Sequence, residues 1–308
     1  MKVAYSVLAA RSDMRHLRKV VEHQVQASCY DFSDRFIVMD TAPLSGERYE
    51  NKDIPTQQDF EALCQQMVED GIVDRVIPVN YDRSIRDPIM KKHLGSQWLS
   101  THDFRGGPIY PLLFGYEQAQ NADYFLHFDS DVFLHQPMEA SWVKNAISLM
   151  EEYENILTAT PLPGPPTPTG ALKKQDIDYV GGYEKDERGF YVFEAFTARR
   201  HLLHCDRYET LLPLPREHIS WKRRLWTLVF GGSALWSWEK MVGKALEDSS
   251  FIRADLIDPG SWTLHALHKD EWFYDHLEEI IERVEKGTFP EDQRGNYDLA
   301  NDAWKTKL

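Results

Sequence analysis

Two hydrophobic periodicities alternate along the first hundred residues. Apolar runs at 3–9, 36–39 and 75–79 are short and dense, which predicts buried strands. Between them, apolar residues recur at helical spacing after Ser12 and again after Thr56, and both hydroxyl residues are expected to cap helix N-termini. Strands that alternate with helices predict an α/β fold with a parallel sheet. Ligands of such sheets bind beyond the carboxyl ends of the strands, so the segments after the three runs should share one rim.

The middle of the chain carries further signals. Residues 108–120 predict a helix, with a proline in its first turn, and 124–128 and 132–134 predict two buried strands. The segment 161–170 holds five prolines. It is expected to be a loop or linker, because proline suits neither a helix interior nor a central strand.

A hydrophobic stripe at helical spacing marks the C-terminal part of the chain. Its members are Phe273, Leu277, Ile280 or Ile281, and Val284, and Gly287 is expected to end this helix. The polar residues 288–308 are expected to wrap the surface.

Composition and charge narrow the classes of function. The chain has 308 residues, with 49 acidic against 35 basic side chains and a formal net charge of −14. Such an acidic protein has no general attraction for nucleic-acid phosphates or for an anionic bilayer, which argues against nonspecific nucleic-acid binding. No apolar run is long enough to span a membrane, and the apolar N-terminal run is interpreted as a strand rather than a signal peptide. Three cysteines without a C-x-x-C pair fit neither a disulfide framework nor a zinc site, so a cytoplasmic location is expected.

Asp129-Ser130-Asp131 directly follows the strand at 124–128 and is the strongest chemical signal. Two carboxylates at the end of a buried strand need a positive partner. Mg²⁺ or Mn²⁺ prefers one or two carboxylates together with phosphate oxygens and water. Alternation along a strand would place Asp129 and Asp131 on one side and Ser130 on the other. The structural alternative is an Asx-turn, which Asp and Ser also favour.

The βαβαβ start, Arg105-Gly106-Gly107 ahead of a helix, and the run ADYFLHFDSDVFL together resemble the GT-A fold glycosyltransferases. The resemblance is closest to family-2-like enzymes that use nucleotide-diphosphate sugars. It implies a Rossmann-like nucleotide-binding sheet merged with a smaller acceptor-binding half in a single catalytic domain. Residues 1–160 would bind the nucleotide sugar, and 161–308 would bind the acceptor and carry the C-terminal helix and tail. The implied activity is a metal-dependent hexosyl transfer from a UDP-sugar to a hydroxyl acceptor.

The resemblance also implies roles for individual residues. The strand ends near Ala9 and Asp40 would hold the base and the ribose, Arg11 would also contact the nucleotide, and Arg105 would approach the diphosphate. Asp131 would ligate the Mn²⁺ or Mg²⁺, and Asp129 would reach the ribose or the metal ion. A turn-forming role is the alternative for Asp40, and a solvated loop cation is the alternative for Arg105.

The segment 262–269, WTLHALHK, offers another metal ligand and a cation. In many GT-A enzymes a histidine late in the chain joins the metal and a nearby lysine neutralises the diphosphate, and His265 and Lys269 would take these roles. His268 is the competing ligand, and a surface or core histidine is the structural alternative. A nitrogen ligand beside oxygens would favour Mn²⁺ over Mg²⁺.

Residues 228–240, LVFGGSALWSWEK, resemble the acceptor segment of the same family. Gly231 and Gly232 permit close approach of the backbone to a ligand, and Trp236 and Trp238 offer indole faces to a sugar ring. Tryptophan is also common in buried packing, which is the alternative for each of them and for the nearby Trp221 and Trp226.

The sequence identifies neither a single catalytic base nor a single role for the basic segment of the C-terminal half. An inverting enzyme needs a carboxylate that deprotonates the acceptor hydroxyl, and the candidates are Glu239, Asp255 and Asp258. The sequence leaves the stereochemistry undecided. Residues 199–224 carry an excess of basic side chains, which would suit an anionic acceptor, the diphosphate or a peripheral membrane surface.

Three other interpretations compete with glycosyl transfer. FDSDVFL also resembles the first motif of haloacid-dehalogenase-type phosphatases, but that motif normally belongs to the first strand. A sugar nucleotidyltransferase also uses metal-bound carboxylates, although AARSDMR lacks the glycines usual after its first strand. A catalytically inactive homologue that binds a nucleotide or a glycan is the third.

Overall fold

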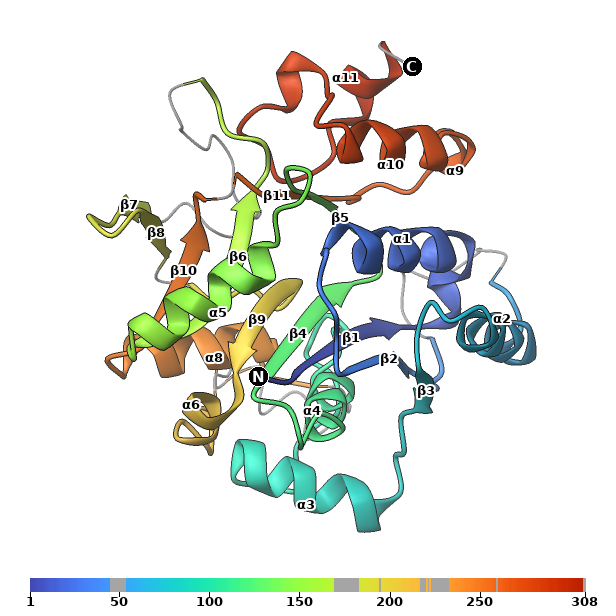
Figure 1. Cartoon of the computed structure of the whole chain (residues 1–308). Helices are drawn as coiled ribbons and strands as arrows, with labels where there is room; N and C mark the ends of the chain where they lie inside the picture. Colours follow the sequence, from blue (N-terminus) through green and yellow to red (C-terminus); the bar gives the residue numbers. More distant parts are fainter. Residues whose placement is uncertain are drawn as a thin grey trace.

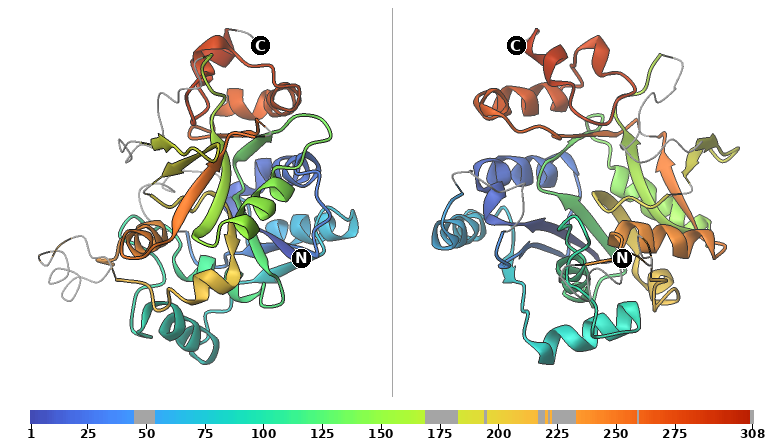
Figure 2. Two further views of the ribbon diagram at one scale, coloured as in Figure 1. Left: turned by 60° about the vertical axis from the view of Figure 1, so that its left-hand side comes forward. Right: turned by 180° about the vertical axis from the view of Figure 1, so that it is seen from behind.

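The computed structural model describes residues 1–44, 54–168, 183–193, 195–216, 220, 222, 233–258 and 260–306. Within these ranges the chain forms an eleven-stranded mixed sheet with helices on both faces (Figure 1, Figure 2). The predicted α/β fold class is therefore confirmed.

The N-terminal elements alternate between strand and helix as the periodicities predict. Their order is β1 (Val3–Ala9), the short 3₁₀ helix η1 (Arg11–Asp13), α1 (Met14–Ala27), β2 (Asp34–Met39), α2 (Gln57–Glu69), β3 (Arg75–Pro78), α3 (Arg83–Leu94), α4 (Tyr110–Glu117), β4 (Tyr124–Asp129), β5 (Val132–His135) and α5 (Trp142–Glu152).

The C-terminal elements complete the sheet and cover one of its ends. Their order is β6 (Ile156–Pro163), β7 (Tyr183–Lys185), β8 (Phe190–Phe193), β9 (Arg200–His204), α6 (Cys205–Glu209), α8 (Trp238–Glu247), β10 (Ile252–Leu256), β11 (Trp262–His265), α9 (Glu271–Asp275), α10 (Leu277–Glu285), η3 (Glu291–Gln293) and α11 (Asn301–Lys305).

The sheet has a parallel half and a mixed half. β3, β2, β1 and β4 are adjacent in that order and parallel, which is the arrangement that the N-terminal pattern predicts. β9 lies antiparallel to β4, and β6, β10, β8 and β7 follow beyond it. β5 pairs with β11, which also joins β6. Strands from both ends of the sequence therefore meet next to the turn between β4 and β5.

Side chains of the central strands enter two separate cores. In β1, Val3, Tyr5 and Val7 pack under α1, α2 and α5, whereas Ala4 faces the core under α3, α4 and α8. This alternation follows from the two-residue period of a strand. A third core lies between β5, β11 and the C-terminal helices and contains the fully buried Trp304.

The proline-rich segment is not a linker over its whole length. Pro161 and Pro163 belong to β6, an interior strand that pairs with β9, β10 and β11. The N–H of Leu162 donates to the carbonyl of Ser261, just before β11, at 3.0 Å, and the N–H of Gly164 donates to the carbonyl of Thr263 in β11 at 2.9 Å. Prolines at the alternate positions therefore remove no donor from this ladder, which is how an interior strand accommodates them.

Of three predicted helices in the N-terminal half, two differ from the structure at their ends by a turn or less, and one start is confirmed. Ser12 does not cap α1, since η1 precedes this helix and Asp13 accepts the N–H of Ala10 instead. Thr56 does cap α2, accepting the N–H of Asp59 at 3.1 Å. The helix predicted at 108–120 is the shorter α4, because Pro108 takes part in a β-bridge ahead of it.

The C-terminal hydrophobic stripe forms two helices instead of one. His276 separates α9, which ends at Asp275, from α10, which begins at Leu277; Gly287 follows the end of α10 with a φ of +65°. Residues after 288 do not simply wrap the surface, because Gln293, Tyr297 and Trp304 are buried. The tail is therefore part of the folded core, although its polar composition gives no indication of this.

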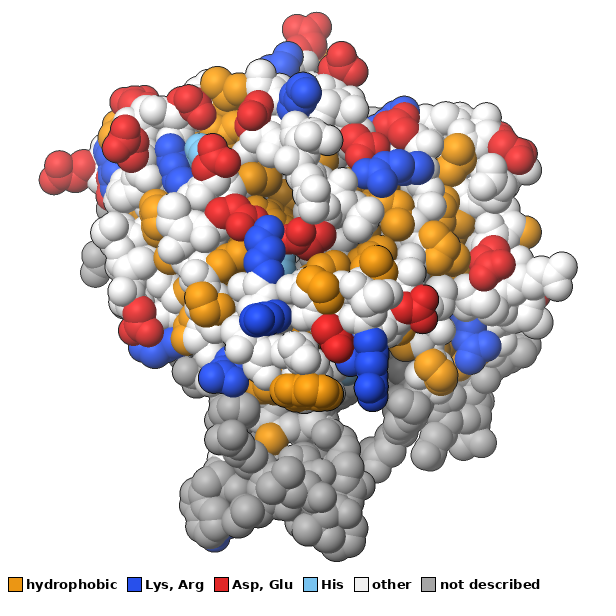
Figure 3. Space-filling view, turned by 90° about the horizontal axis from the view of Figure 1, so that it is seen from below, with side chains coloured by type: hydrophobic (Ala, Val, Ile, Leu, Met, Phe, Trp, Pro, Cys, Tyr) orange, Lys and Arg blue, Asp and Glu red, His pale blue; other side chains and the backbone are white. Residues whose placement is uncertain are grey.

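The surface shows no sorting of charge on the face that Figure 3 displays. Acidic and basic side chains lie side by side there, with hydrophobic atoms between them (Figure 3). Trp98 is a large exposed apolar residue, with 76% of its surface accessible. In the described parts of the chain, no helix combines the length and apolar character required to cross a membrane.

Replacement of Trp304 by alanine should lower the free energy of unfolding by about 3–5 kcal/mol, because it empties a fully buried site and removes a 2.9 Å hydrogen bond to Gln293. Urea denaturation measures this loss. The matched control is Trp98→Ala, which should change the same free energy by less than about 0.5 kcal/mol. Equal effects of the two substitutions would contradict the packed position of the tail.

Candidate active site

The carboxyl ends of the parallel strands form one rim. Ala9 lies opposite Met39 in the β1–β2 register, and Leu8 lies opposite Asp129 in the β1–β4 register. The N–H of Asp40 donates to the carbonyl of Ala9 at 2.8 Å, which ties the first two strand ends together. The predicted shared rim is therefore present.

Asp129 is the last residue of β4, and Ser130-Asp131 forms a tight turn before β5. The side chain of Gln24 in α1 holds both ends of this turn, since its amide donates to the carbonyls of Asp129 and Val132 at 2.9 and 2.7 Å. Because Ser130 and Asp131 lie in a turn, strand alternation does not apply to the motif. The turn instead gives the two carboxylates different surroundings.

Asp129 and Asp131 face different partners. Asp129 Oδ1 lies 3.3 Å from His127 Nε2, and its side chain is 37% exposed. Asp131 is 14% exposed and accepts a hydrogen bond from Lys269 Nζ, which also donates to the carbonyl of Ala266. Burial would raise the pKa of Asp131, but the nearby positive charge of His265 and Lys269 outweighs it and holds this pKa well below the ordinary value.

Of the two histidines in the segment 262–269, His265 is the one that lies beside Asp131. Its Nε2 lies 3.7 Å from Asp131 Oδ1, and its Nδ1 lies 2.8 Å from Asp298 Oδ1. Arg199 Nη1 lies against the same ring, 2.7 Å from Nδ1 and 3.0 Å from Nε2. His268 is exposed. The structure therefore brings His265 and Lys269, rather than His268, to Asp131.

Two residues of the site carry no recognisable sequence signal. Asp13 and His16 project from η1 and α1, and His16 Nε2 lies 3.4 Å from Ser130 Oγ. Burial, together with the charges of Asp131 and Asp129, raises the pKa of Asp13 to about 6. Burial lowers the pKa of His16 to about 4. Asp13 does follow the first strand, but nothing in its spacing distinguishes it from an ordinary helix start.

Asp40 lies further along the rim in a network of donors. Tyr81 donates to its Oδ1 at 2.7 Å, the N–H of Ala42 donates to the same oxygen at 2.9 Å, and His102 Nε2 lies 3.5 Å from Oδ2. Burial would raise the pKa of Asp40, but these interactions, with His102 first, lower it below the ordinary value. Asp40 is therefore a fixed carboxylate at the rim.

Arg105 and Trp236 lie together although they are far apart in the sequence. The loop that carries Arg105 is fixed by Asp103, whose carboxylate accepts the N–H groups of Arg105 and Gly107, each at 2.7 Å. The N–H of Phe104 donates to the carbonyl of Leu235. Phe104 also packs edge-on against Trp236, and the Arg105 guanidinium lies 5.9 Å from the Trp236 ring. Trp236 is half-buried at this junction.

Several predicted site residues lie elsewhere. Trp238 is 1% exposed and packs against Phe196 and Tyr208, so its role is core packing and the prediction of a sugar platform is wrong. Asp255 is fully buried, and both of its oxygens are bound by Arg253 at 2.7 Å, which makes it an unsuitable base. Both predictions are wrong for the same reason, because residue type alone does not indicate whether a side chain is buried.

The other predicted contacts are placed as follows. Glu239 accepts the N–H of Ala198 at 2.9 Å, and Asp258 is exposed and accepts from Asn145. Ala9 is buried at the end of β1, and Arg11 is half-buried in η1. Outside the described residues lie Gly231, Gly232, Trp221 and Trp226.

The basic segment that begins at Arg199 is not a single surface. Arg199 contacts His265, whereas Arg200 is buried with its guanidinium 4.1 Å from the Tyr297 ring. Arg207 donates to backbone carbonyls at the end of α5 and at the start of β6. Over the described residues the predicted cluster therefore points in several directions, and only its first member reaches the acidic turn.

The donor set fits a divalent ion held by two side chains. Adjacent ligands of an octahedral Mg²⁺ or Mn²⁺ lie roughly 3 Å apart. Asp131 Oδ1 and His265 Nε2 are 3.7 Å apart, so the two atoms would have to approach each other only slightly to become adjacent ligands of one ion. In the part of the chain that the structure describes, no group of three His, Cys, Asp or Glu side chains is placed to hold a metal ion. Water or phosphate oxygens would have to supply the remaining ligands, as is usual for Mg²⁺.

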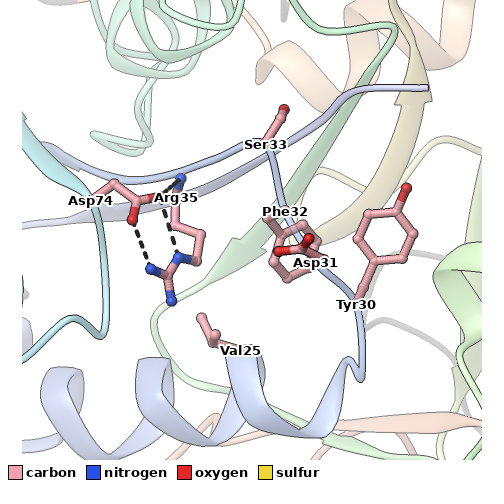
Figure 4. A pocket seen from close by; sticks show the side chains of 7 residues that line it. All are labelled: Val25, Tyr30, Asp31, Phe32, Ser33, Arg35 and Asp74. Carbon is pink, nitrogen blue, oxygen red and sulfur yellow. Dashed lines mark hydrogen bonds and ion pairs between the residues drawn. The ribbon is translucent and has the colours of Figure 1, made fainter.

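A cavity of about 410 Å³ lies at the opposite rim of the sheet. Its walls include Tyr30, Phe32 and the ion pair of Arg35 with Asp74, which Figure 4 shows facing each other. These residues lie at the amino ends of β2 and β3, whereas ligands of parallel sheets bind at the carboxyl ends. The cavity is therefore separate from the candidate site.

No protein-family model and no curated protein sequence matches the chain. Among similar solved structures is GalNAc-T7 with UDP, GalNAc and Mn²⁺, at 10% identity over 86% of this chain and 44% of that chain, with a TM-score of 0.49. S. aureus TarS is similar at 12% identity over 85% of this chain and 36% of that chain, with a TM-score of 0.41. UDP-glucose pyrophosphorylase complexed with UDP-glucose is similar at 14% identity over 83% of this chain and 90% of that chain, with a TM-score of 0.40. The chain spans less than half of the first two proteins, and these likenesses concern the fold.

Replacement of Tyr81 by phenylalanine should raise the pKa of Asp40, because the lost hydroxyl donates to its carboxylate and favours the charged form. A ¹³C NMR titration of the Asp40 carboxyl measures this shift. A lowered folded pKa means that the stabilisation by Asp40 is complete above the ordinary aspartate pKa and is lost as the pH falls through the folded value. The substitution should move that loss to higher pH. Tyr30→Phe at the opposite rim is the control, and an unchanged Asp40 titration in Tyr81→Phe would refute the network.

Proposed function

We propose that the chain is a metal-dependent GT-A type glycosyltransferase, which transfers a sugar from a nucleotide-diphosphate sugar, most simply a UDP-sugar, to a hydroxyl acceptor. The observation that carries the proposal is the placement of Asp131, His265 and Lys269 together at the carboxyl rim of the parallel sheet. Carboxylate, imidazole and ammonium are the groups needed to hold a metal ion and to meet a diphosphate at one point. The sequence resemblance supports the same assignment.

Asp131 and His265 would hold the ion, and Asp129 would lie beside it toward the ribose. A bound Mn²⁺ or Mg²⁺ would neutralise charge on the departing diphosphate. The imidazole ligand favours Mn²⁺ over Mg²⁺. Lys269 and Arg199 place two further positive charges within contact of Asp131 or His265. Such cations stabilise negative charge that develops on a leaving group.

The nucleotide would lie along the rim from Ala9 to Asp40. The fixed carboxylate of Asp40 suits hydroxyl donors such as those of a ribose, because a carboxylate only accepts hydrogen bonds. Arg105 would approach the diphosphate from its glycine-rich loop. These assignments follow the family resemblance, and the shared rim supports them.

The acceptor would bind near Trp236, which lies beside Arg105 at the junction of two chain segments. We assign no catalytic base. Asp255 is bound by Arg253, and Glu239 accepts a backbone N–H, so neither stands out as a group that could take the acceptor proton.

Asp131→Asn should abolish the Mn²⁺-dependent part of UDP binding while the melting temperature stays close to that of the wild type, because it removes the charge of the principal ligand. Isothermal titration calorimetry of UDP with and without Mn²⁺ measures this. Asp206→Asn, at an exposed site in α6, is the matched control and should bind as the wild type does. Mn²⁺-dependent UDP affinity that survives in Asp131→Asn would overturn the metal assignment.

A screen of nucleotide sugars for hydrolysis then identifies the donor. Release of nucleoside diphosphate supports glycosyl transfer. Mn²⁺-dependent UDP binding without turnover of any donor would indicate an inactive homologue. Exchange of pyrophosphate into a nucleoside triphosphate would indicate a nucleotidyltransferase instead, and either result would overturn the proposed reaction.

Trp236→Ala should leave UDP affinity nearly unchanged and should reduce transfer to the acceptor by as much as about 100-fold, because a misplaced acceptor hydroxyl reacts slowly. Donor hydrolysis by water should persist. Parallel assays of transfer and hydrolysis measure the split, with the exposed Trp98→Ala as the control. If transfer and UDP binding fell together, Trp236 would have a structural role.

A further inference from the structure

The C-terminal tail is built into the candidate metal site. The N–H of His265 donates to the carbonyl of Tyr297 at 3.0 Å, and the N–H of Leu299 donates to the carbonyl of His265 at 2.8 Å. These bonds form a parallel bridge between His265 and Asp298. Asp298 is therefore held directly beside the imidazole by the backbone on both sides of it.

A buried glutamine fixes the part of the tail that carries Asp298. Gln293 is completely buried, and its amide donates to the carbonyls of Asn296 and Asp298 at 2.9 and 3.0 Å. Its carbonyl oxygen accepts from the N–H of Ala300 and from the indole of Trp304, each at 2.9 Å. The bond to the Asp298 carbonyl would have to break before Asp298 could leave its position, and the other three hold Gln293 itself in place. The tail loop is consequently a rigid support.

The ring of His265 is fixed on its face as well as at its edge. It stacks on Tyr297 with ring centres 5.7 Å apart and an angle of 17° between the planes. The buried guanidinium of Arg200 lies 4.1 Å from the same tyrosine ring. Rotation of the imidazole would separate it from Tyr297 and from Asp298 at the same time.

The partners of the two ring nitrogens define which of them carries the proton. A carboxylate can only accept, so Nδ1, 2.8 Å from Asp298 Oδ1, must be the protonated nitrogen. When the ring is neutral, Nε2 then keeps its lone pair on the side of Asp131, where it is available to a metal ion. Arg199 Nη1 lies 2.7 Å from Nδ1 and 3.0 Å from Nε2, near both nitrogens, so the tautomer follows from the contact with Asp298 and not from Arg199.

We propose that Asp298 is a positioning residue for the metal site: it holds His265 in the Nδ1–H tautomer with Nε2 directed at Asp131. The inference rests on the proposed function, since it concerns the same ion. Asp298 does not itself ligate the metal. Carboxylates that hold a ligand histidine in this way raise the basicity of the ring and fix its orientation, and their loss typically weakens metal binding by about 10–100-fold.

Mn²⁺ titration followed by EPR tests the inference on the full chain with UDP present. Asp298→Ala should bind Mn²⁺ about 10–100-fold more weakly than the wild type, and Asp298→Asn should lie between them, because its amide oxygen still accepts the Nδ1 proton. His265→Ala should lose the site, and His268→Ala should not. Asp302→Ala, an exposed acid of the same tail, is the matched control and should bind as the wild type does.

The possible outcomes distinguish a failure of the positioning role of Asp298 from a failure of the proposed function. If the wild type binds no Mn²⁺, the proposed function fails. If the wild type binds and His265→Ala does not, but Asp298→Ala binds normally, the positioning role alone is overturned. Long-range ¹H–¹⁵N NMR of the His265 ring gives a readout without metal: the wild type should show the Nδ1–H tautomer, and Asp298→Ala should lose it. Should Asp298→Ala fail to fold, Asp298→Asn decides, and normal Mn²⁺ affinity with an unchanged tautomer would overturn the role.

Discussion

Negative charge at the end of a buried strand is the constraint around which this site is built. Asp129 and Asp131 close β4 where the sheet core ends, and Asp13 and Asp298 bring two further carboxylates to the same region. Such a concentration is costly unless positive groups meet it. Lys269 and Arg199 do so, with the imidazole of His265 beside them, and these groups come from two parts of the chain, just before β9 and at or just after the end of β11. The low pKa of Asp131 reflects this balance.

Strands of the mixed half of the sheet place these basic groups beside the acidic turn. β9 pairs with β4 and places Arg199 at the turn, since the N–H of Asp129 donates to the Arg199 carbonyl at 2.7 Å. β11 pairs with β5 and places His265 opposite Val132, immediately after the turn. Antiparallel pairing beside the motif thus brings residues separated by more than 130 positions to one point. The prolines of β6 are tolerated because that strand supports β11 through its alternate N–H groups.

Residue pattern was sufficient for those parts of the fold and site that depend on local sequence. Alternating periods predicted the parallel strands and their common rim, and the segment around His265 was identified because histidine and lysine occur there together. Asp298 could not be identified in this way, because its contact with His265 depends on a tail conformation set by Gln293 and Trp304. The predictions for Trp238 and Asp255 were wrong for the converse reason. Their residue types indicated a role in the site, but Trp238 is buried in the core and Asp255 is buried in an ion pair.

The same charge balance explains why a lysine lies on the principal acid. Asp131 is a largely buried carboxylate that needs a positive partner, and Lys269 reaches it from the loop after β11. Lysine is a flexible point charge, unlike the fork of an arginine, so it can turn from a carboxylate to a phosphate without a change in the backbone. His265 is held by Tyr297 and Asp298 and does not share this freedom. The proposed site would therefore combine one movable cation with one fixed imidazole, which would allow an ion and a diphosphate to enter together while the orientation of the imidazole is kept.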